Sequence, residues 1–169
     1  MLAQLQDEQQ KFLQSNSKAF PAGVLQIPAK ISKGENYQGL PYLVLDYPRY
    51  FEKNDHFAIR TMFWWGNFFS TTLYLSGSNK KIYEDKIGSC FTLLQQEDFF
   101  IGVNADQWEH HFESSNYLPL KEMNDAGFKK HVRDKEFIKL AKRFSLEEWD
   151  NAEDILFTCF CQLIRWLSN

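Results

Sequence analysis

Three side chains with complementary chemistry stand close together along the chain: Asp46, His56 and Arg60. Asp46 lies near the end of an apolar, β-prone run, and His56 and Arg60 lie at the start of the next one. Antiparallel pairing of these two runs would bring all three side chains to one edge of a sheet. A carboxylate, an imidazole and a guanidinium can together position a small anion or serve as acid and base. The alternative is an Asp–Arg ion pair that only neutralises the end of the sheet.

Two further residues extend this candidate site. Arg49 follows Asp46 in the segment Asp46-Tyr47-Pro48-Arg49 and adds a second guanidinium. Trp64 belongs to an unusually aromatic chain, in which Phe, Tyr and Trp make up 17% of the residues. Such aromatic residues either fill a core or line a pocket. We therefore predict a ligand-binding set of Asp46, Arg49, His56, Arg60 and Trp64, with no residue assigned as catalytic.

Other motifs offer less chemistry. Glu109-His110-His111 lies near Asp106 and resembles a set of metal ligands, but adjacent histidines point apart on a regular helix or strand, which favours a polar surface loop. Cys159 and Cys161 have one residue between them, unlike zinc ligand pairs, and are interpreted as buried thiols. The glycine-rich phosphate loops, the zinc-protease motif and the hydrolase serine motif are all absent. No metal and no cofactor are predicted.

Three β-rich runs must position the candidate site. Tyr42–Tyr47, Phe57–Trp65 and Phe68–Leu75 are dominated by β-branched and aromatic residues, and Gly66-Asn67 between the last two predicts a two-residue hairpin turn. That turn pairs Trp65 with Phe68. The short run Phe99–Val103 predicts a fourth strand beside the hairpin. Because neither face of the hairpin is cleanly polar, we expect both faces to be covered.

Helices are expected to flank this sheet. Apolar spacing predicts helices over Leu2–Leu13, Lys80–Gln96 and Phe128–Phe144, and the pattern Ser145-Leu146-Glu147-Glu148 predicts the start of a final helix. Phe20–Glu35 is expected to be an extended connector, with a short strand at Val24–Ile27. The prediction is one α+β domain over residues 1–169, with an antiparallel sheet and a C-terminal two-helix segment.

The final helix carries two apolar stripes. The main stripe, from Trp149 to Leu167, is expected to dock on the sheet. A second stripe, formed by Phe157, Cys161 and Ile164, must be covered either within the chain or by a second copy in a homodimer.

Charge and hydropathy limit the remaining possibilities. The chain has 19 Lys and Arg against 22 Asp and Glu, with no long basic run, so no nucleic-acid partner is predicted. It has no long uninterrupted apolar stretch, so no membrane span is predicted either. Three cysteines, an odd number, favour reduced thiols in a cytoplasmic protein. We expect a protein that binds a small molecule or another protein; the alternative is a small cofactor-independent enzyme that uses Asp46, His56 and Arg60.

Overall fold

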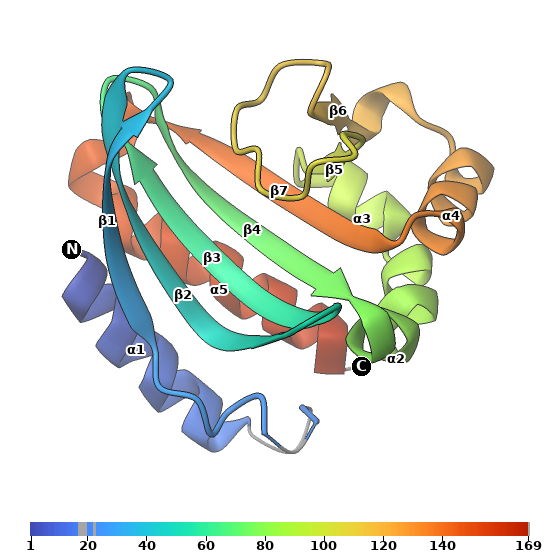
Figure 1. The fold of residues 1–169 in the computed structure, drawn as a ribbon, viewed down its shortest axis with the longest axis horizontal. Helices are drawn as coiled ribbons and strands as arrows, with labels where there is room; N and C mark the ends of the chain where they lie inside the picture. The colour runs from blue at the N-terminus through green and yellow to red at the C-terminus, as the bar shows by residue number, and fades with distance from the viewer. Residues whose placement is uncertain (17–19, 22, 169) are drawn as a thin grey trace.

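The computed structural model describes residues 1–16, 20–21 and 23–168. A seven-stranded, entirely antiparallel sheet has the order β1-β2-β3-β4-β7-β5-β6 (Figure 1). The elements are α1 Leu2–Ser15, β1 Lys30–Tyr37, β2 Leu40–Glu52, β3 Asp55–Trp64, β4 Phe68–Ser76, α2 Gly77–Ser89, α3 Phe91–Gln96, β5 Phe100–Gly102, β6 Tyr117–Pro119, the 3-10 helix η2 Leu120–Glu122, α4 Asp125–Asp134, β7 Phe137–Ser145, the 3-10 helix η3 Leu146–Asn151 and α5 Ala152–Ser168. The predicted α+β class with an antiparallel sheet is confirmed.

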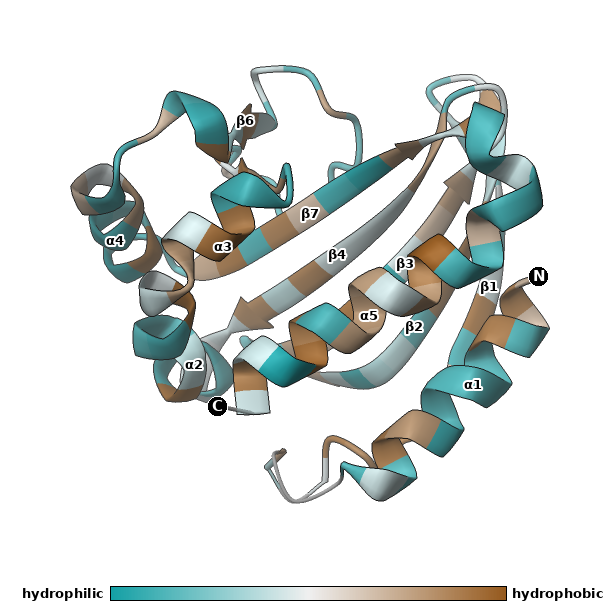
Figure 2. Cartoon of the chain, turned by 180° about the vertical axis from the view of Figure 1, so that it is seen from behind, coloured by the Kyte–Doolittle hydropathy of each residue, from teal (hydrophilic) through white to brown (hydrophobic). Residues whose placement is uncertain are grey.

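One face of the sheet supports the main core. Helix α5 crosses this face, and α1 lies beside it over the β1–β2 side (Figure 2). Alternate residues of the strands point into this layer, among them Leu45, Phe57, Ile59, Phe69 and Leu73, all of them buried. The opposite face is covered over part of its area by residues 103–116, called here the covering loop, which runs in front of the sheet in Figure 1. Both faces of the hairpin are therefore covered, as predicted.

The hairpin register differs from the prediction by one residue. Trp64, not Trp65, pairs with Phe68, because the turn has three residues and Gly66 adopts a positive φ of 68°. A change of one residue in register exchanges the two faces of a strand. Arg60 therefore pairs with Thr72, and its side chain lies on the face beneath the covering loop.

The largest correction concerns residues 137–145. They form strand β7, between β4 and β5, whereas the sequence pattern predicted a helix through to Phe144. The segment alternates along the strand: Ile138 and Leu140 point into the core, and Lys139 and Ala141 point to the opposite face. Helix α4 ends at Asp134, so only the first part of the predicted helix is helical.

Three smaller predictions also differ from the structure. Residues 24–27 form turns, and the edge strand of this region is β1, from Lys30. Strand β2 continues past Pro48 to Glu52, with a shift of register between Asp46 and Arg49. The predicted fourth strand exists as β5, but it pairs with β7 and β6 instead of the hairpin.

The second stripe of α5 is covered within the chain. The ring of Phe12 on α1 packs edge-on against Phe157, with 6.0 Å between centroids, while Cys161 and Ile164 are buried. This stripe therefore gives no reason to expect a homodimer. All three cysteines are free thiols. Among the described residues, no helix is both long and apolar enough to cross a membrane.

Candidate functional site

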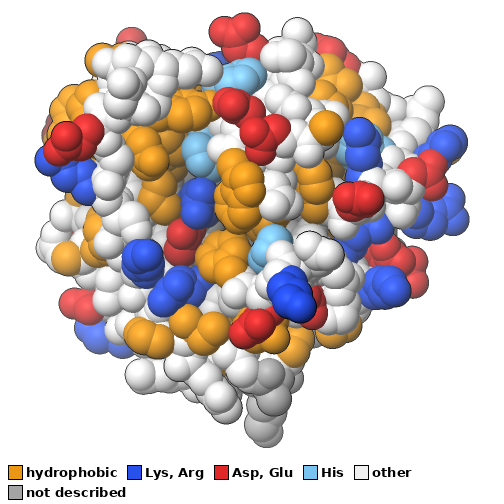
Figure 3. Space-filling view, in the orientation of Figure 1, with side chains coloured by type: hydrophobic (Ala, Val, Ile, Leu, Met, Phe, Trp, Pro, Cys, Tyr) orange, Lys and Arg blue, Asp and Glu red, His pale blue; other side chains and the backbone are white. Residues whose placement is uncertain are grey.

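Strands β2, β3, β4 and β7 bring a set of polar side chains together beneath the covering loop. Arg60 occupies the middle of this face, Thr72 and Tyr74 lie beside it on β4, and Lys139 lies on β7 opposite Tyr74. In the space-filling view, charged, histidine and hydrophobic side chains surround a hollow on this face (Figure 3). The sheet thus gathers charge in a place that strands usually fill with apolar side chains.

Asp46 and Arg60 form the ion pair at its centre. They stand directly opposite each other in the β2–β3 ladder, and two hydrogen bonds join them, Nε to Oδ1 at 2.7 Å and Nη2 to Oδ2 at 2.9 Å. Burial alone would lower the pKa of Arg60, but the hydrogen bonds and charge of Asp46 outweigh it and raise that pKa. Such a two-bond pair fixes the guanidinium plane.

His110 reaches the same guanidinium from the covering loop. Its Nε2 lies 3.3 Å from Arg60 Nη1, and its ring lies 5.5 Å from that of Tyr37. Since arginine can only donate, Nε2 must accept this hydrogen bond, which assigns the proton of the neutral ring to Nδ1. Burial, followed by the positive charges of Arg60 and Lys139, lowers the pKa of His110 to about 3. The imidazole is therefore neutral at physiological pH.

Lys139 is the second buried cation of this face. Its side chain is nearly inaccessible, with the residue 2% exposed; its Nζ donates to the carbonyl of Glu109 and lies 4.8 Å from the ring centroid of Tyr117. No carboxylate of the described residues lies within ion-pair distance of it. Burial and then the charge of Arg60 lower the pKa of Lys139 to about 8, although Asp106 and Glu109 oppose this at longer range.

We expect the stability of a Lys139→Met variant to reveal this lowered pKa. In the wild type the native lysine releases its proton near pH 8, whereas the unfolded chain holds it to about pH 10.5. The unfolded state binds more protons between these values, so wild-type stability should rise with pH there. Relative to the variant, the rise should reach about 2.5 kcal/mol between about pH 7 and pH 10. Urea unfolding of both proteins measures it, and a difference independent of pH would contradict the prediction.

The covering loop is held down mainly by Tyr37 of β1. The Tyr37 hydroxyl accepts hydrogen bonds from the backbone N–H groups of His110 at 2.8 Å and His111 at 2.9 Å, and donates to Glu109 Oε2 at 2.8 Å. Burial is the main reason that the pKa of Tyr37 rises to about 12. Tyr74 adds a hydrogen bond to Gln107. The loop is thus fastened to both sides of the polar centre.

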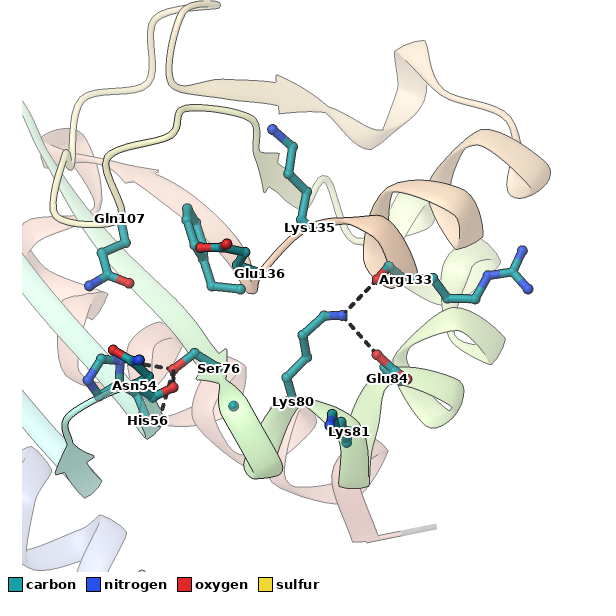
Figure 4. Close-up of a pocket in the computed structure, with 12 residues that line it drawn as sticks. Asn54, His56, Ser76, Lys80, Lys81, Glu84, Gln107, Arg133, Lys135 and Glu136 are labelled. Atoms are coloured by element: carbon teal, nitrogen blue, oxygen red, sulfur yellow. Dashed lines mark hydrogen bonds and ion pairs between the residues drawn. The ribbon is translucent and has the colours of Figure 1, made fainter.

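Two cavities adjoin at Gln107. The inner one is small, about 20 Å³, and lies between Arg60, Lys139, His110, Tyr74 and the ring of Trp108. The outer one is an open cleft of about 490 Å³ at the end of the sheet, between β4, α2 and α4 (Figure 4). It is lined by Asn54, His56, Ser76, Gly77, Lys80, Lys81, Glu84, Gln107, Arg133, Lys135, Glu136 and Phe137. Gln107 and its bond to Tyr74 therefore separate an accessible cleft from the buried cations.

Some polar groups that line the outer cleft already have hydrogen-bond partners within the chain. Lys80 Nζ donates to Glu84 Oε2 at 2.9 Å and to the carbonyl of Arg133 at 3.0 Å, as Figure 4 shows. The N-terminus of α2 is occupied by the carboxylate of Asp55, which accepts from Asn79 N at 3.0 Å. A buried positive charge without a carboxylate partner among the described residues lies further in, at Lys139.

The five residues of the predicted set separate into different places. Asp46 and Arg60 meet as predicted, but His56 lies on the far side of Trp108, whose ring is 5.9 Å from His56 and 6.0 Å from the Arg60 guanidinium carbon. His56 lines the outer cleft, with its Nδ1 3.0 Å from Ser76 Oγ, and burial lowers its pKa. An acid–base group of Asp46, His56 and Arg60 is therefore not assembled.

Arg49 and Trp64 take no part in this centre. The Nε of Arg49 donates to the carbonyl of Pro28 at 2.8 Å, just before the start of β1. Trp64 is buried in a second apolar cluster, where its ring lies 5.0 Å from Tyr37 and 5.2 Å from Phe68. Its Nε1 has no hydrogen-bond partner among the described residues. Trp64 thus supports Tyr37, and through it the covering loop, from below.

Sequence reasoning missed Lys139, Tyr74 and Trp108 and placed His110 on a surface loop. Lys139 was hidden because its segment was interpreted as helical, although the alternation of Ile138, Lys139 and Leu140 is that of a strand. No sequence pattern indicated that residues 103–116 fold back over the sheet.

Within the described residues, no group of three or more His, Cys, Asp or Glu side chains could hold a metal ion. No protein-family model, no curated protein and no solved structure matches the chain.

Proposed function

We propose that this protein binds a small organic anion through the polar centre beneath the covering loop. The observation that carries the proposal is the surplus of buried positive charge. Arg60 and Lys139 share one face, yet Asp46 is the only carboxylate within ion-pair distance of either in the described part of the chain. A buried cation without a partner is costly, and groups perturbed in this way cluster at functional sites.

The walls of the site favour a ligand with a flat apolar part. The indole of Trp108 and the rings of Phe51 and Tyr74 surround the inner cavity, and the ring centroids of Tyr74 and Trp108 are 5.6 Å apart. Aromatic walls with a few convergent polar groups are typical of small-molecule sites. The inner cavity, about 20 Å³, is smaller than such a ligand, so binding requires Trp108 and Gln107 to move toward the outer cleft.

The geometry favours binding over the acid–base enzyme considered from the sequence. Arg60 and Asp46 hold each other in a two-bond ion pair, and Trp108 lies between them and His56. Arg60 and Lys139 supply positive charge, and Tyr74 supplies a hydroxyl that can donate. These are the groups that orient an anion.

Phenyl phosphate tests the proposal because it combines an anion with an aromatic ring. A ligand that binds only the native state raises the free energy of unfolding by about 2.7 kcal/mol at roughly a hundredfold excess over its Kd. We expect phenyl phosphate to raise the Tm of the wild type, and neutral benzyl alcohol to leave it unchanged.

Matched lysine variants make this test specific. Lys139→Met should abolish the rise in Tm, whereas Lys129→Met should retain it, because Lys129 is exposed and paired with Asp125 on α4. Equal stabilisation of wild type and Lys139→Met would place the anion elsewhere. The absence of any stabilisation by phenyl phosphate, inorganic phosphate or benzoate would contradict the proposed function.

A further inference from the structure

Two exposed tryptophans contact the same buried phenylalanine at the end of the sheet that carries the β3–β4 turn. Trp65 in that turn is 44% exposed, and Trp149 in η3 is 54% exposed. The ring of buried Phe63 lies 4.2 Å from that of Trp65 and 5.3 Å from that of Trp149. Both indoles therefore pack on Phe63, and Trp149 also packs on Phe69; the two exposed indoles are called here the tryptophan patch.

The patch corrects a prediction from the sequence. Trp149 was expected to lie in the buried stripe of the final helix, but α5 begins only at Ala152, and residues 146–151 form the 3-10 helix η3. Trp149 is held over Phe69, at 5.6 Å between ring centroids, with more than half of its surface left open. Monomeric proteins rarely expose large apolar patches, and tryptophan is enriched among the residues that dominate binding at protein interfaces.

An acidic segment borders the patch. The sequence from Leu146 to Asp154 reads LEEWDNAED, and no Lys or Arg occurs between Arg143 and Arg165. Glu147, Glu148 and Asp150 are exposed, and no ion pair joins them to any described residue. Glu153 is the one member near a cation, with its Oε2 4.0 Å from the N-terminal ammonium. Three exposed carboxylates without an ion-pair partner among the described residues therefore border the patch at Trp149.

We propose that the tryptophan patch docks a protein partner that presents a basic segment with apolar side chains. Lysine and arginine stems can lie across the indole faces while their charges meet the carboxylates of η3. The same negative charge argues against two other occupants. A twofold contact with a second copy would bring identical acidic segments together, and the phosphates of nucleic acids or of an anionic membrane would be repelled. This surface is separate from the anion site beneath the covering loop.

Selection from a displayed library of random peptides tests the proposal. Peptides selected on the wild type should be rich in Lys or Arg together with Leu, Phe or Trp. Their affinity for Trp149→Ala and for Trp65→Ala should fall about 30-fold, which equals the roughly 2 kcal/mol of an interface hot spot. Both side chains are exposed, so both variants should fold, which circular dichroism verifies. The triple variant Glu147→Gln, Glu148→Gln, Asp150→Asn should also weaken binding, with a reduced dependence on salt.

The controls separate this surface from others. Ile82→Ala removes an exposed apolar side chain of similar exposure on α2 and should leave peptide affinity unchanged. Selected peptides that are acidic, or that bind Trp149→Ala as tightly as the wild type, would overturn the proposal. So would a wild-type dimer in sedimentation that becomes a monomer in Trp149→Ala, because the occupant would then be a second copy.

Discussion

Replacing Arg60 by methionine is expected to lower the free energy of unfolding by about 3–5 kcal/mol, because it leaves the carboxylate of Asp46 buried without its partner. Asp46 is 6% exposed, and both of its oxygens accept from Arg60. The variant also removes the donor to His110 Nε2. Urea unfolding at neutral pH measures the change.

A double variant distinguishes an unpaired charge from lost packing. Arg60→Met with Asp46→Leu removes both charges and replaces them by apolar groups, which for buried pairs is often neutral or even stabilising. The double variant should therefore recover most of the stability lost by Arg60→Met. Lys130→Met serves as the surface control, since the Lys130–Asp134 pair is exposed and should contribute little to stability. A double variant as unstable as Arg60→Met would mean that packing around Arg60 is what matters.

The Asp46–Arg60 pair was predictable because it depends only on local antiparallel order. Asp46 ends one β-prone run and Arg60 begins the next, so a short connection brings them together whatever covers the sheet. The register of the next hairpin was harder to predict from the sequence. A turn of two or three residues fits the same Gly66-Asn67 pair, and that single residue decides which residues of β4 share the face of Arg60.

The remainder of the site depends on contacts between distant segments. Lys139 lies in FIKLAKRFS, whose lysines, leucine and alanine also suit a helix, and only pairing with β4 and β5 makes it a strand. His110 and Trp108 reach the sheet because Tyr37 holds the backbone of the covering loop from more than 70 residues away, at sequence separations of 73 and 74 to His110 and His111. Sequence periodicity carries no information about such contacts.

These contacts also explain why the charged side chains of the polar centre stay buried beneath the covering loop. Tyr37, Tyr74 and Lys139 each form a hydrogen bond with the covering loop, so the loop supplies the acceptors that the buried side of the sheet would otherwise lack. A ligand that enters from the outer cleft must replace at least the Tyr74–Gln107 bond. Its anionic group would offer Lys139 a stronger acceptor than the Glu109 carbonyl.

Acid should destabilise the protein through His110, and this is expected to be the largest single pH effect of the site. The native pKa of His110 is about 3, against 6.5 for the ordinary side chain. Between these two values the unfolded chain binds a proton that the native protein does not bind. The free energy of unfolding therefore falls as the pH drops below about 6.5 and levels off near pH 3. The full loss corresponds to about 5 kcal/mol, and about 3 kcal/mol of it should have occurred by pH 4.

A His110→Gln variant isolates this contribution. Glutamine has no proton to gain in this range, while the titrations of the carboxylates are common to both proteins and cancel in the difference. The variant can lose stability at pH 7 through changed packing against Tyr37. The informative quantity is therefore the difference in free energy of unfolding, wild type minus variant, and how it changes with pH. Between about pH 7 and pH 4 that difference should shift by about 3 kcal/mol in favour of the variant and stay constant above pH 7. A difference that does not change with pH would mean that the imidazole accepts a proton as readily in the native site as in the unfolded chain, and that Arg60 does not hold it neutral.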